Sequence, residues 1–129
     1  MLSSNILNNV GTEQLIQKTS VFLQEWLKNG LAIEKKNRHG GFRGRTLNLN
    51  SSRTALSWES NIRRRSVGVG VASPTHVVLV RDITSVETEE RLVTLEANSA
   101  FSSFRFASAE DAVIFVQCVE RIRSAVVAP

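Results

Sequence analysis

The residues of this chain that are best suited to bind a ligand lie between Lys35 and Arg45. This stretch reads KKNRHGGFRGR and holds five cationic side chains and three glycines. Glycine lets a backbone come close to a ligand, and lysine and arginine supply hydrogen-bond donors that suit phosphate. The stretch therefore predicts an anion-binding loop. Its cationic donors are Lys35, Lys36, Arg38, Arg43 and Arg45.

A second basic motif is the run Arg63-Arg64-Arg65, which is followed directly by Ser66. Such a run before a serine matches a basic-directed kinase site, so Ser66 is a candidate phosphorylation site. A phosphate there would add about −1.5 to −2 charges beside the basic residues. We expect that modification to weaken any attachment to an anionic surface.

Residues that serve in catalysis or bind metal ions are few in this sequence. His39 lies in the basic stretch, His76 begins a strand pattern and Cys118 falls in a helical pattern. None of them has a catalytic partner at a diagnostic spacing. One cysteine excludes an internal disulfide, and two histidines with scattered acids do not make a metal site. We therefore expect no enzymatic activity, no cofactor and no metal.

The basic residues are concentrated in one part of the chain, although the formal net charge is only +4. Residues 28–65 contain ten of the sixteen Lys and Arg but two of the twelve Asp and Glu. A molecule polarised in this way has a basic face suited to phosphates on lipids, nucleic acid or phosphoproteins. An ordinary solvated face is the alternative. We do not expect nucleic acid as a partner, because no aromatic pair alternates with basic residues as base stacking requires.

Length and composition indicate one globular domain. The chain has 129 residues and 42% hydrophobic content, which suffice for a single core. No apolar run approaches the roughly 20 residues that span a bilayer, and no signal peptide begins the sequence. These features predict a cytoplasmic protein.

Periodicity predicts a helix near each end of the chain with strands between them. Residues 1–11 are polar and indicate a loose N-terminus, and a helix is expected from Thr12, a suitable N-cap, to Asn29. Ser108 is the expected N-cap of the last helix. Alternating patterns predict six or seven antiparallel strands, an α+β or capped-barrel arrangement. The expected strand segments are 31–36, 45–50, 55–59, 76–87, 92–95 and 101–106.

This order of elements resembles a pleckstrin homology (PH) domain from about residue 30 to residue 125. The matching segments are GLAIEKK, RTLNL, ALSWES, VRDITSV and FRFAS, followed by the last helix. Phe115 stands where the helix of the family usually carries tryptophan. The N-terminal helix is similar to that of phosphoinositide-specific phospholipase C PH domains and of small single-PH proteins of the apicomplexan inner membrane complex.

The resemblance implies a seven-stranded, two-sheet, partly open barrel that is capped by the C-terminal helix. The PH-like domain would span residues 30–126, with an additional helix at 12–29 and a loose terminus at 1–11. In lipid-binding members, the loop between the first two strands carries a Lys-x(n)-Lys/Arg-x-Arg signature. Lys36, Arg43 and Arg45 match this signature. The expected surrounding cations are Lys35, Arg38 and Arg63.

The resemblance thus implies a non-catalytic membrane-recruitment module that binds phosphoinositide or other anionic lipid headgroups at a peripheral membrane location. Exposed Phe42 would either enter the headgroup region or fold back on its own turn. Two departures favour a different function. Glu34 lies on the strand face of Lys36, where its carboxylate would repel phosphate or pair with Lys36, and Ile62 replaces a basic residue. The alternative is a protein-interaction or scaffold module with a degenerate lipid pocket.

Overall fold

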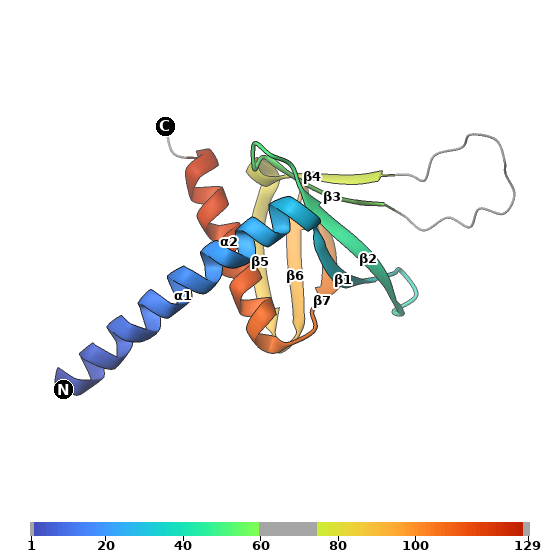
Figure 1. The fold of residues 1–129 in the computed structure, drawn as a ribbon. Helices are drawn as coiled ribbons and strands as arrows, with labels where there is room; N and C mark the ends of the chain where they lie inside the picture. Colours follow the sequence, from blue (N-terminus) through green and yellow to red (C-terminus); the bar gives the residue numbers. More distant parts are fainter. Residues whose placement is uncertain (1, 60–74, 128–129) are drawn as a thin grey trace, which may run out of the picture.

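The computed structural model has seven strands that follow one long helix along the chain and precede another, and the two helices cross on the same side of the strands (Figure 1). It describes the backbone of residues 2–59 and 75–127, and the side chains of residues 13–59 and 75–126. The elements are α1 Leu2–Asn29, β1 Leu31–Lys36, β2 Phe42–Leu49, β3 Ala55–Glu59, β4 Thr75–Leu79, the 3-10 helix η2 Val80–Asp82, β5 Ile83–Glu89, β6 Leu92–Ala97, β7 Ala100–Arg105 and α2 Ala109–Val127. The expected α+β class is confirmed.

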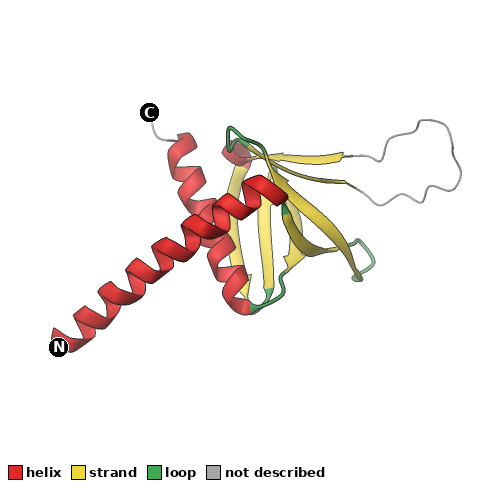
Figure 2. Ribbon diagram, viewed as in Figure 1, coloured by secondary structure: helices red, strands yellow, loops and turns green. Residues whose placement is uncertain are grey.

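All strand pairs are antiparallel, and the spatial order is β4-β3-β2-β1-β7-β6-β5. β2 connects the two halves of this open sheet, because residues 42–47 pair with β1 while residues 48–49 pair with β3. α2 packs against β5, β6 and η2, and Figure 2 shows α1 crossing α2. The predicted seven antiparallel strands, partial opening and C-terminal cap are confirmed, although the strands form one continuous hydrogen-bonded sheet rather than two.

Two strand predictions need correction: β2 begins at Phe42 rather than at residue 45, and residues 76–87 do not form a continuous strand. The chain leaves β4 after Leu79, makes one turn as η2 and resumes as β5 at Ile83. The backbone N–H of Val80 donates a 2.8 Å hydrogen bond to the carbonyl oxygen of Thr54, which holds this turn. Val80 is buried and β-branched, so it continues the apolar pattern and conceals the break from sequence periodicity.

Helix α1 begins at Leu2 rather than at Thr12. Asparagine and glycine near its start are poor helix formers, but extending an existing helix costs far less than nucleating one. At its C-terminal end α1 joins the core, because Trp26 is 1% exposed and its ring centre lies 5.1 Å from that of Phe115. The indole Nε1–H also donates to the carbonyl oxygen of Leu47 at 3.1 Å. No helix in the described part of the chain is long and apolar enough to cross a membrane.

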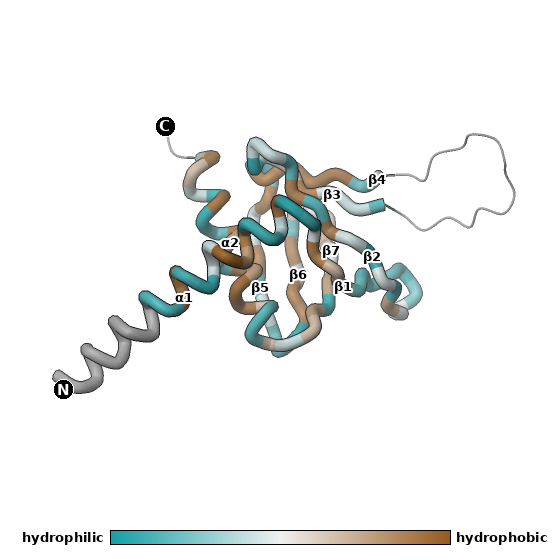
Figure 3. Tube along the Cα trace, viewed as in Figure 1, coloured by the Kyte–Doolittle hydropathy of each residue, from teal (hydrophilic) through white to brown (hydrophobic). Residues whose placement is uncertain are grey.

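Helix α2 closes the core as its sequence predicted. The Ser108 hydroxyl accepts a 3.1 Å hydrogen bond from the backbone N–H of Asp111, which confirms the expected N-cap. Phe115 is fully buried, and its ring centre lies 4.8 Å from that of Phe106. Figure 3 shows hydrophobic residues gathered in β6 and at the crossing of the two helices, while hydrophilic residues dominate the loop between β1 and β2.

Candidate functional site

The loop between β1 and β2 is a short turn that its own hydrogen bonds hold in shape. The Asn37 side-chain oxygen accepts from the backbone N–H of His39 at 2.9 Å and from that of Gly41 at 3.0 Å. The Asn37 N–H donates to the Gly41 carbonyl oxygen at 2.7 Å. Gly40 has φ +89, a left-handed conformation that favours glycine. The predicted loop is thus a preformed turn, and it presents exposed Arg38 to solvent.

Strand register decides which of the basic side chains lie together. Lys35 is directly opposite Arg43, and Ile33 is directly opposite Arg45. Directly opposed residues point to the same face of an antiparallel pair, and Ile33 is 4% exposed, so this face is the core-facing side of the sheet. Lys35, Arg43 and Arg45 therefore extend the core-facing side of β1 and β2 beyond the last buried residues.

The matched signature implied that Lys36 lies together with Arg43 and Arg45, but the structure separates it from them. It pairs with Phe42 across the strands and lies on the outer face of β1 with Glu34. The physical reason is the two-residue period of a strand, which sends neighbouring lysines to opposite faces. Lys35 was expected only among the cations around the signature residues, but it is the lysine that shares a face with the two arginines.

Aromatic rings form the floor beneath Lys35. Its Nζ lies 5.8 Å from the ring centre of Trp58 and 5.9 Å from that of Phe104, and it donates to the Lys36 carbonyl oxygen at 2.8 Å. Burial lowers the pKa of Lys35, and the charge of Arg45 lowers it further. An anion that bridges these cations would relieve that unfavourable charge.

The sequence-based prediction of the site did not include the aromatic residues around Lys35. Trp58 stacks on His76 with ring centres 5.5 Å apart, and it meets Phe104 edge-on at 5.2 Å. Period-two alternation indicated that Trp58 and Phe104 are core residues, but not that they lie under a lysine. That contact depends on the pairing of β1 with β7, where Lys35 is opposite Phe104.

Glu34 pairs with Arg105 rather than with Lys36. Arg105 Nε donates a 2.7 Å hydrogen bond to Glu34 Oε1 across the β1–β7 pair. This hydrogen bond lowers the pKa of Glu34 and raises that of Arg105, although desolvation opposes both shifts. The Arg105 guanidinium carbon also lies 4.0 Å from the ring centre of Phe42, so this phenylalanine packs against β7. The carboxylate is therefore neutralised on the outer face of the sheet.

Several residues singled out from the sequence lie outside the proposed binding face or outside the described part of the chain. Arg63, Ser66 and Ile62 lie outside the described residues. Cys118 is buried, and burial raises the pKa of its thiol to about 11. Within residues 13–59 and 75–126, no group of three or more His, Cys, Asp and Glu side chains is arranged to hold a metal ion.

The cations on the inner face have no carboxylate partner in the described part of the chain. The ion pairs in the described part of the chain are Lys18–Glu110, Glu34–Arg105 and Glu120–Arg123, and none of them includes Lys35, Arg43 or Arg45. Arg45 donates from Nη1 to the Gly44 carbonyl oxygen at 2.6 Å, and Arg43 is exposed. The arrangement can therefore supply several cationic donors to one anion without first breaking an ion pair.

No family model matches the sequence, and no curated protein matches it either. Solved structures do resemble the fold. Inner Membrane Complex Sub-compartment Protein 3 from Toxoplasma gondii matches with a TM-score of 0.66 and 13% identity, over 84% of this chain and 85% of that chain. Sub-compartment Protein 1 from the same organism matches with a TM-score of 0.63 and 17% identity, over 82% of this chain and 90% of that chain.

The N-terminal PH domain of human ARAP2 gives a TM-score of 0.56 and 10% identity, over 75% of this chain and 79% of that chain. At such low identities the likeness concerns the fold alone. Strand order, the capping helix and these neighbours agree with one another, and they confirm the resemblance that the sequence segments indicated. The chain therefore has a PH-like fold with an additional N-terminal helix.

Proposed function

We propose that this PH-like domain is a non-catalytic membrane-recruitment module, and that it binds phosphoinositide or other anionic lipid headgroups through the inner ends of β1 and β2. The observation that carries the proposal is the shared face of Lys35, Arg43 and Arg45, none of which has a carboxylate partner among the described residues. Neighbouring phosphates on an inositol ring need several converging donors, and arginine offers two parallel hydrogen bonds to each phosphate.

The other basic residues have a supporting role in this proposal. Lys36 on the outer face, exposed Arg38 in the loop and Arg63 would add attraction to the membrane surface around the bound headgroup. Each such residue near an anionic membrane contributes about 1 kcal/mol. Binding would therefore be reversible, and stable residence at a membrane would need a further anchor. Two of the structural neighbours are inner membrane complex proteins, which supports a membrane-associated location.

Glu34 does not weigh against this function in the way its sequence position suggested. Its carboxylate is paired with Arg105 and lies on the opposite face of β1 from Lys35. A phosphate on the inner face would meet cations and aromatic rings. This pairing of Glu34 supports a functional headgroup site over a degenerate one.

Co-sedimentation with phosphatidylcholine vesicles, with and without phosphatidylserine or phosphoinositide, tests the proposal. We expect Arg43→Gln and Arg45→Gln each to weaken binding to phosphoinositide vesicles about tenfold, because each removes charged hydrogen bonds. Arg81→Gln is the matched control, since exposed Arg81 lies in η2 beside the β2–β3 turn, away from the β1–β2 loop.

Two results would count against specific headgroup recognition. Negligible binding of the wild-type chain to every vesicle would exclude the lipid function. Equal binding to all anionic vesicles, abolished by salt and by none of the single variants, would leave only nonspecific electrostatic attraction.

A protein-interaction or scaffold module is the second candidate, and one observation favours it. A cavity of about 800 Å³ lies between α1 and the start of α2, where the side chains of Ile16 and Val21 are 49% and 64% exposed. Exposed apolar surface of this kind is typical of association sites. Sedimentation velocity of the wild-type chain and of Val21→Asp tests whether the chain associates with itself there. Absence of concentration-dependent association in the wild type would remove this self-assembly version.

A further inference from the structure

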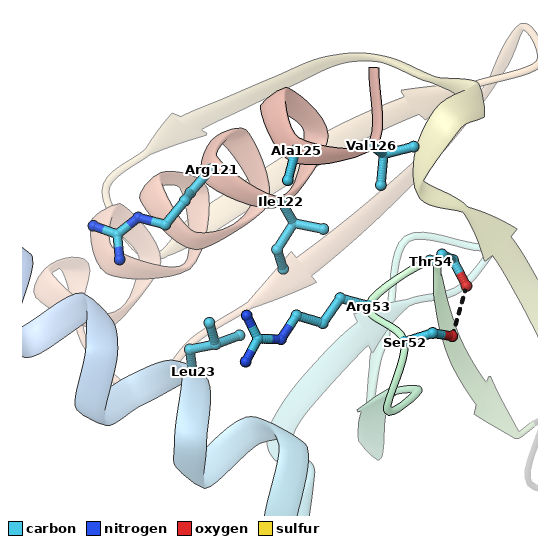
Figure 4. Close-up of a pocket in the computed structure, with 8 residues that line it drawn as sticks. All are labelled: Leu23, Ser52, Arg53, Thr54, Arg121, Ile122, Ala125 and Val126. Carbon is cyan, nitrogen blue, oxygen red and sulfur yellow. Dashed lines mark hydrogen bonds between the residues drawn. The ribbon is translucent and has the colours of Figure 1, made fainter. Parts of the chain in front are cut away.

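A separate cavity lies between α1, the β2–β3 turn and the last turns of α2 (Figure 4). Its volume is about 420 Å³, within the range of about 300–1,000 Å³ that is typical of small-molecule sites. The β2–β3 turn is at the opposite end of β2 from the β1–β2 loop, so this cavity is not part of the headgroup site proposed above.

One wall of the cavity is apolar. Leu23 of α1 and Ile122 of α2 are buried at 7% and 4% exposure, and half-buried Val126 continues the wall along α2. Figure 4 shows Ile122 pointing from α2 toward the β2–β3 turn. A hydrocarbon group that packs on this wall would leave water without disturbing a polar partner.

Two arginines line the same cavity. Figure 4 shows the Arg53 side chain extending from the β2–β3 turn to Leu23, whereas the Arg121 side chain extends outward from α2, with its guanidinium group apart from that of Arg53. Both are exposed, and none of the ion pairs in the described residues involves either of them. The nearby Glu120 carboxylate is already bound to Arg123 at 2.6 Å. The cavity therefore combines apolar surface with two cations that no described carboxylate neutralises.

The backbone at Arg53 is held in an unusual conformation. Its φ of 59 lies in the left-handed region, where glycine or asparagine is the ordinary residue. Asn50 maintains this turn, because its side-chain oxygen accepts from the backbone N–H of Thr54 at 2.7 Å and from that of Ala55 at 3.0 Å. The turn thus directs a long cationic side chain into the cavity at a position where a side chain is disfavoured.

We propose that this cavity binds a single-chain amphipathic anion. Its carboxylate or phosphate group contacts Arg53, the exposed side chain of Arg121 turns toward the same group, and its hydrocarbon chain packs on Leu23, Ile122 and Val126. Both kinds of head group accept two parallel hydrogen bonds from a guanidinium, so the shared chemistry is an acidic head on a short acyl or alkyl chain. Such a ligand would couple the β2–β3 turn to both helices.

Isothermal titration calorimetry of the full chain with decanoate and with decyl phosphate, each below its micelle concentration, tests the proposal and distinguishes the two head groups. We expect saturable binding of one ligand per chain. Arg53→Asn tolerates the left-handed backbone, and Arg121→Gln retains a good helix former. Each variant should weaken binding about tenfold, because it removes a charged hydrogen-bond donor.

A second type of variant tests the cavity itself. Ala125 lines the cavity and is exposed on α2, so Ala125→Trp should fill the space and abolish binding while the far-ultraviolet circular dichroism stays unchanged. Arg43→Gln is the control for charge, since Arg43 lies in the other site. It should bind decanoate as the wild type does, and Arg53→Asn should conversely retain binding to phosphoinositide vesicles.

Several outcomes would overturn the proposal. One is that neither decanoate nor decyl phosphate gives a saturable binding curve in the calorimeter. The others are that Arg53→Asn binds these anions as tightly as the wild type does, or that neutral decanol binds as tightly as the anions. Tighter binding of a short peptide with a free C-terminal carboxylate would assign the cavity to a protein partner instead. None of these results depends on whether the β1–β2 loop binds lipid.

Discussion

Glu34 accepts a 2.7 Å hydrogen bond from Arg105, and the pair lies on the face of the sheet opposite to Lys35. The two residues are 71 positions apart in the sequence and meet because β1 pairs with β7. Arg105 also covers the ring of Phe42, so the outer face of the sheet has its own small cluster of charge and aromatic surface. The inner face retains the unpaired cations on which the proposed function rests.

Replacing Glu34 by glutamine should leave phosphoinositide binding unchanged. The carboxylate is already paired with Arg105 and is separated from Lys35 by the sheet itself. Vesicle co-sedimentation of Glu34→Gln beside Arg45→Gln measures this, with Arg45→Gln expected to bind weakly. A large gain of binding in Glu34→Gln would mean that Glu34 does repel the headgroup.

The Glu34–Arg105 pair should make stability depend on acidic pH. The hydrogen bond from Arg105 holds the pKa of Glu34 below its ordinary value in the folded chain. A carboxyl group with a lowered folded-state pKa contributes stability above its unfolded-state pKa and loses that contribution as pH falls through the folded-state value. Thermal unfolding from about pH 7 to about pH 2 should therefore show a smaller pH dependence for Glu34→Gln than for the wild type. Parallel curves for the two proteins would contradict the pairing.

Lys35→Met should separate binding from stability. Burial and the charge of Arg45 lower the pKa of Lys35, so its ammonium form is less favourable in the folded chain than in the unfolded chain. Methionine keeps an apolar stem over Trp58 and Phe104 without the charge, and we expect an unchanged or higher melting temperature. Headgroup binding should nevertheless fall about tenfold. A lower melting temperature with intact binding would place Lys35 in a purely structural role.

In the wild-type chain, a bound headgroup should raise the pKa of Lys35, because a nearby anion favours the ammonium form. A proton titration of the lysine side chains by nuclear magnetic resonance, with and without inositol phosphate, follows this shift. An unchanged Lys35 titration at saturating ligand would place the phosphate elsewhere.

Trp26→Ala should show that α1 belongs to the same cooperative unit as the strands. The variant removes a buried ring from Phe115 and a hydrogen bond to Leu47. We expect a loss of about 3–5 kcal/mol in the free energy of unfolding, measured with denaturant. Val21→Ala on the exposed side of α1 is the matched control and should change it by less than about 0.5 kcal/mol. Similar effects of the two variants would contradict the packing of α1.

Cys118 should be unreactive in the folded chain. Burial raises the pKa of its thiol to about 11, and the Sγ atom lies 3.5 Å from the Thr19 carbonyl oxygen, to which it donates. Because the thiolate is the reactive form, a disulfide reagent at neutral pH should modify the native chain very slowly. The same chain in guanidinium should react at the ordinary rate, which serves as the control. Rapid modification of the native protein would mean that α1 and α2 separate readily.

Much of the architecture could be predicted from local patterns. Alternation at Leu31, Ile33 and Lys35 indicated a strand, Ser108 indicated a helix start, and the glycines around Phe42 indicated the basic turn. Each of these signals acts between residues a few positions apart, where backbone preference and hydrophobic period are sufficient. The alternation also held the information that Lys35 shares a face with Ile33, but the motif comparison favoured Lys36.

By itself, then, the sequence determined the order of the elements, the PH-like class and the position of the basic loop. Only the tertiary structure decided that Glu34 binds Arg105, that Lys35 lies over Trp58, and that Arg53 reaches a cavity between two helices. These contacts join segments far apart in the chain, and they depend on strand order, register and helix packing together. No local pattern specifies which distant side chain will complete a charge or cover a ring, because that choice is made when the core closes.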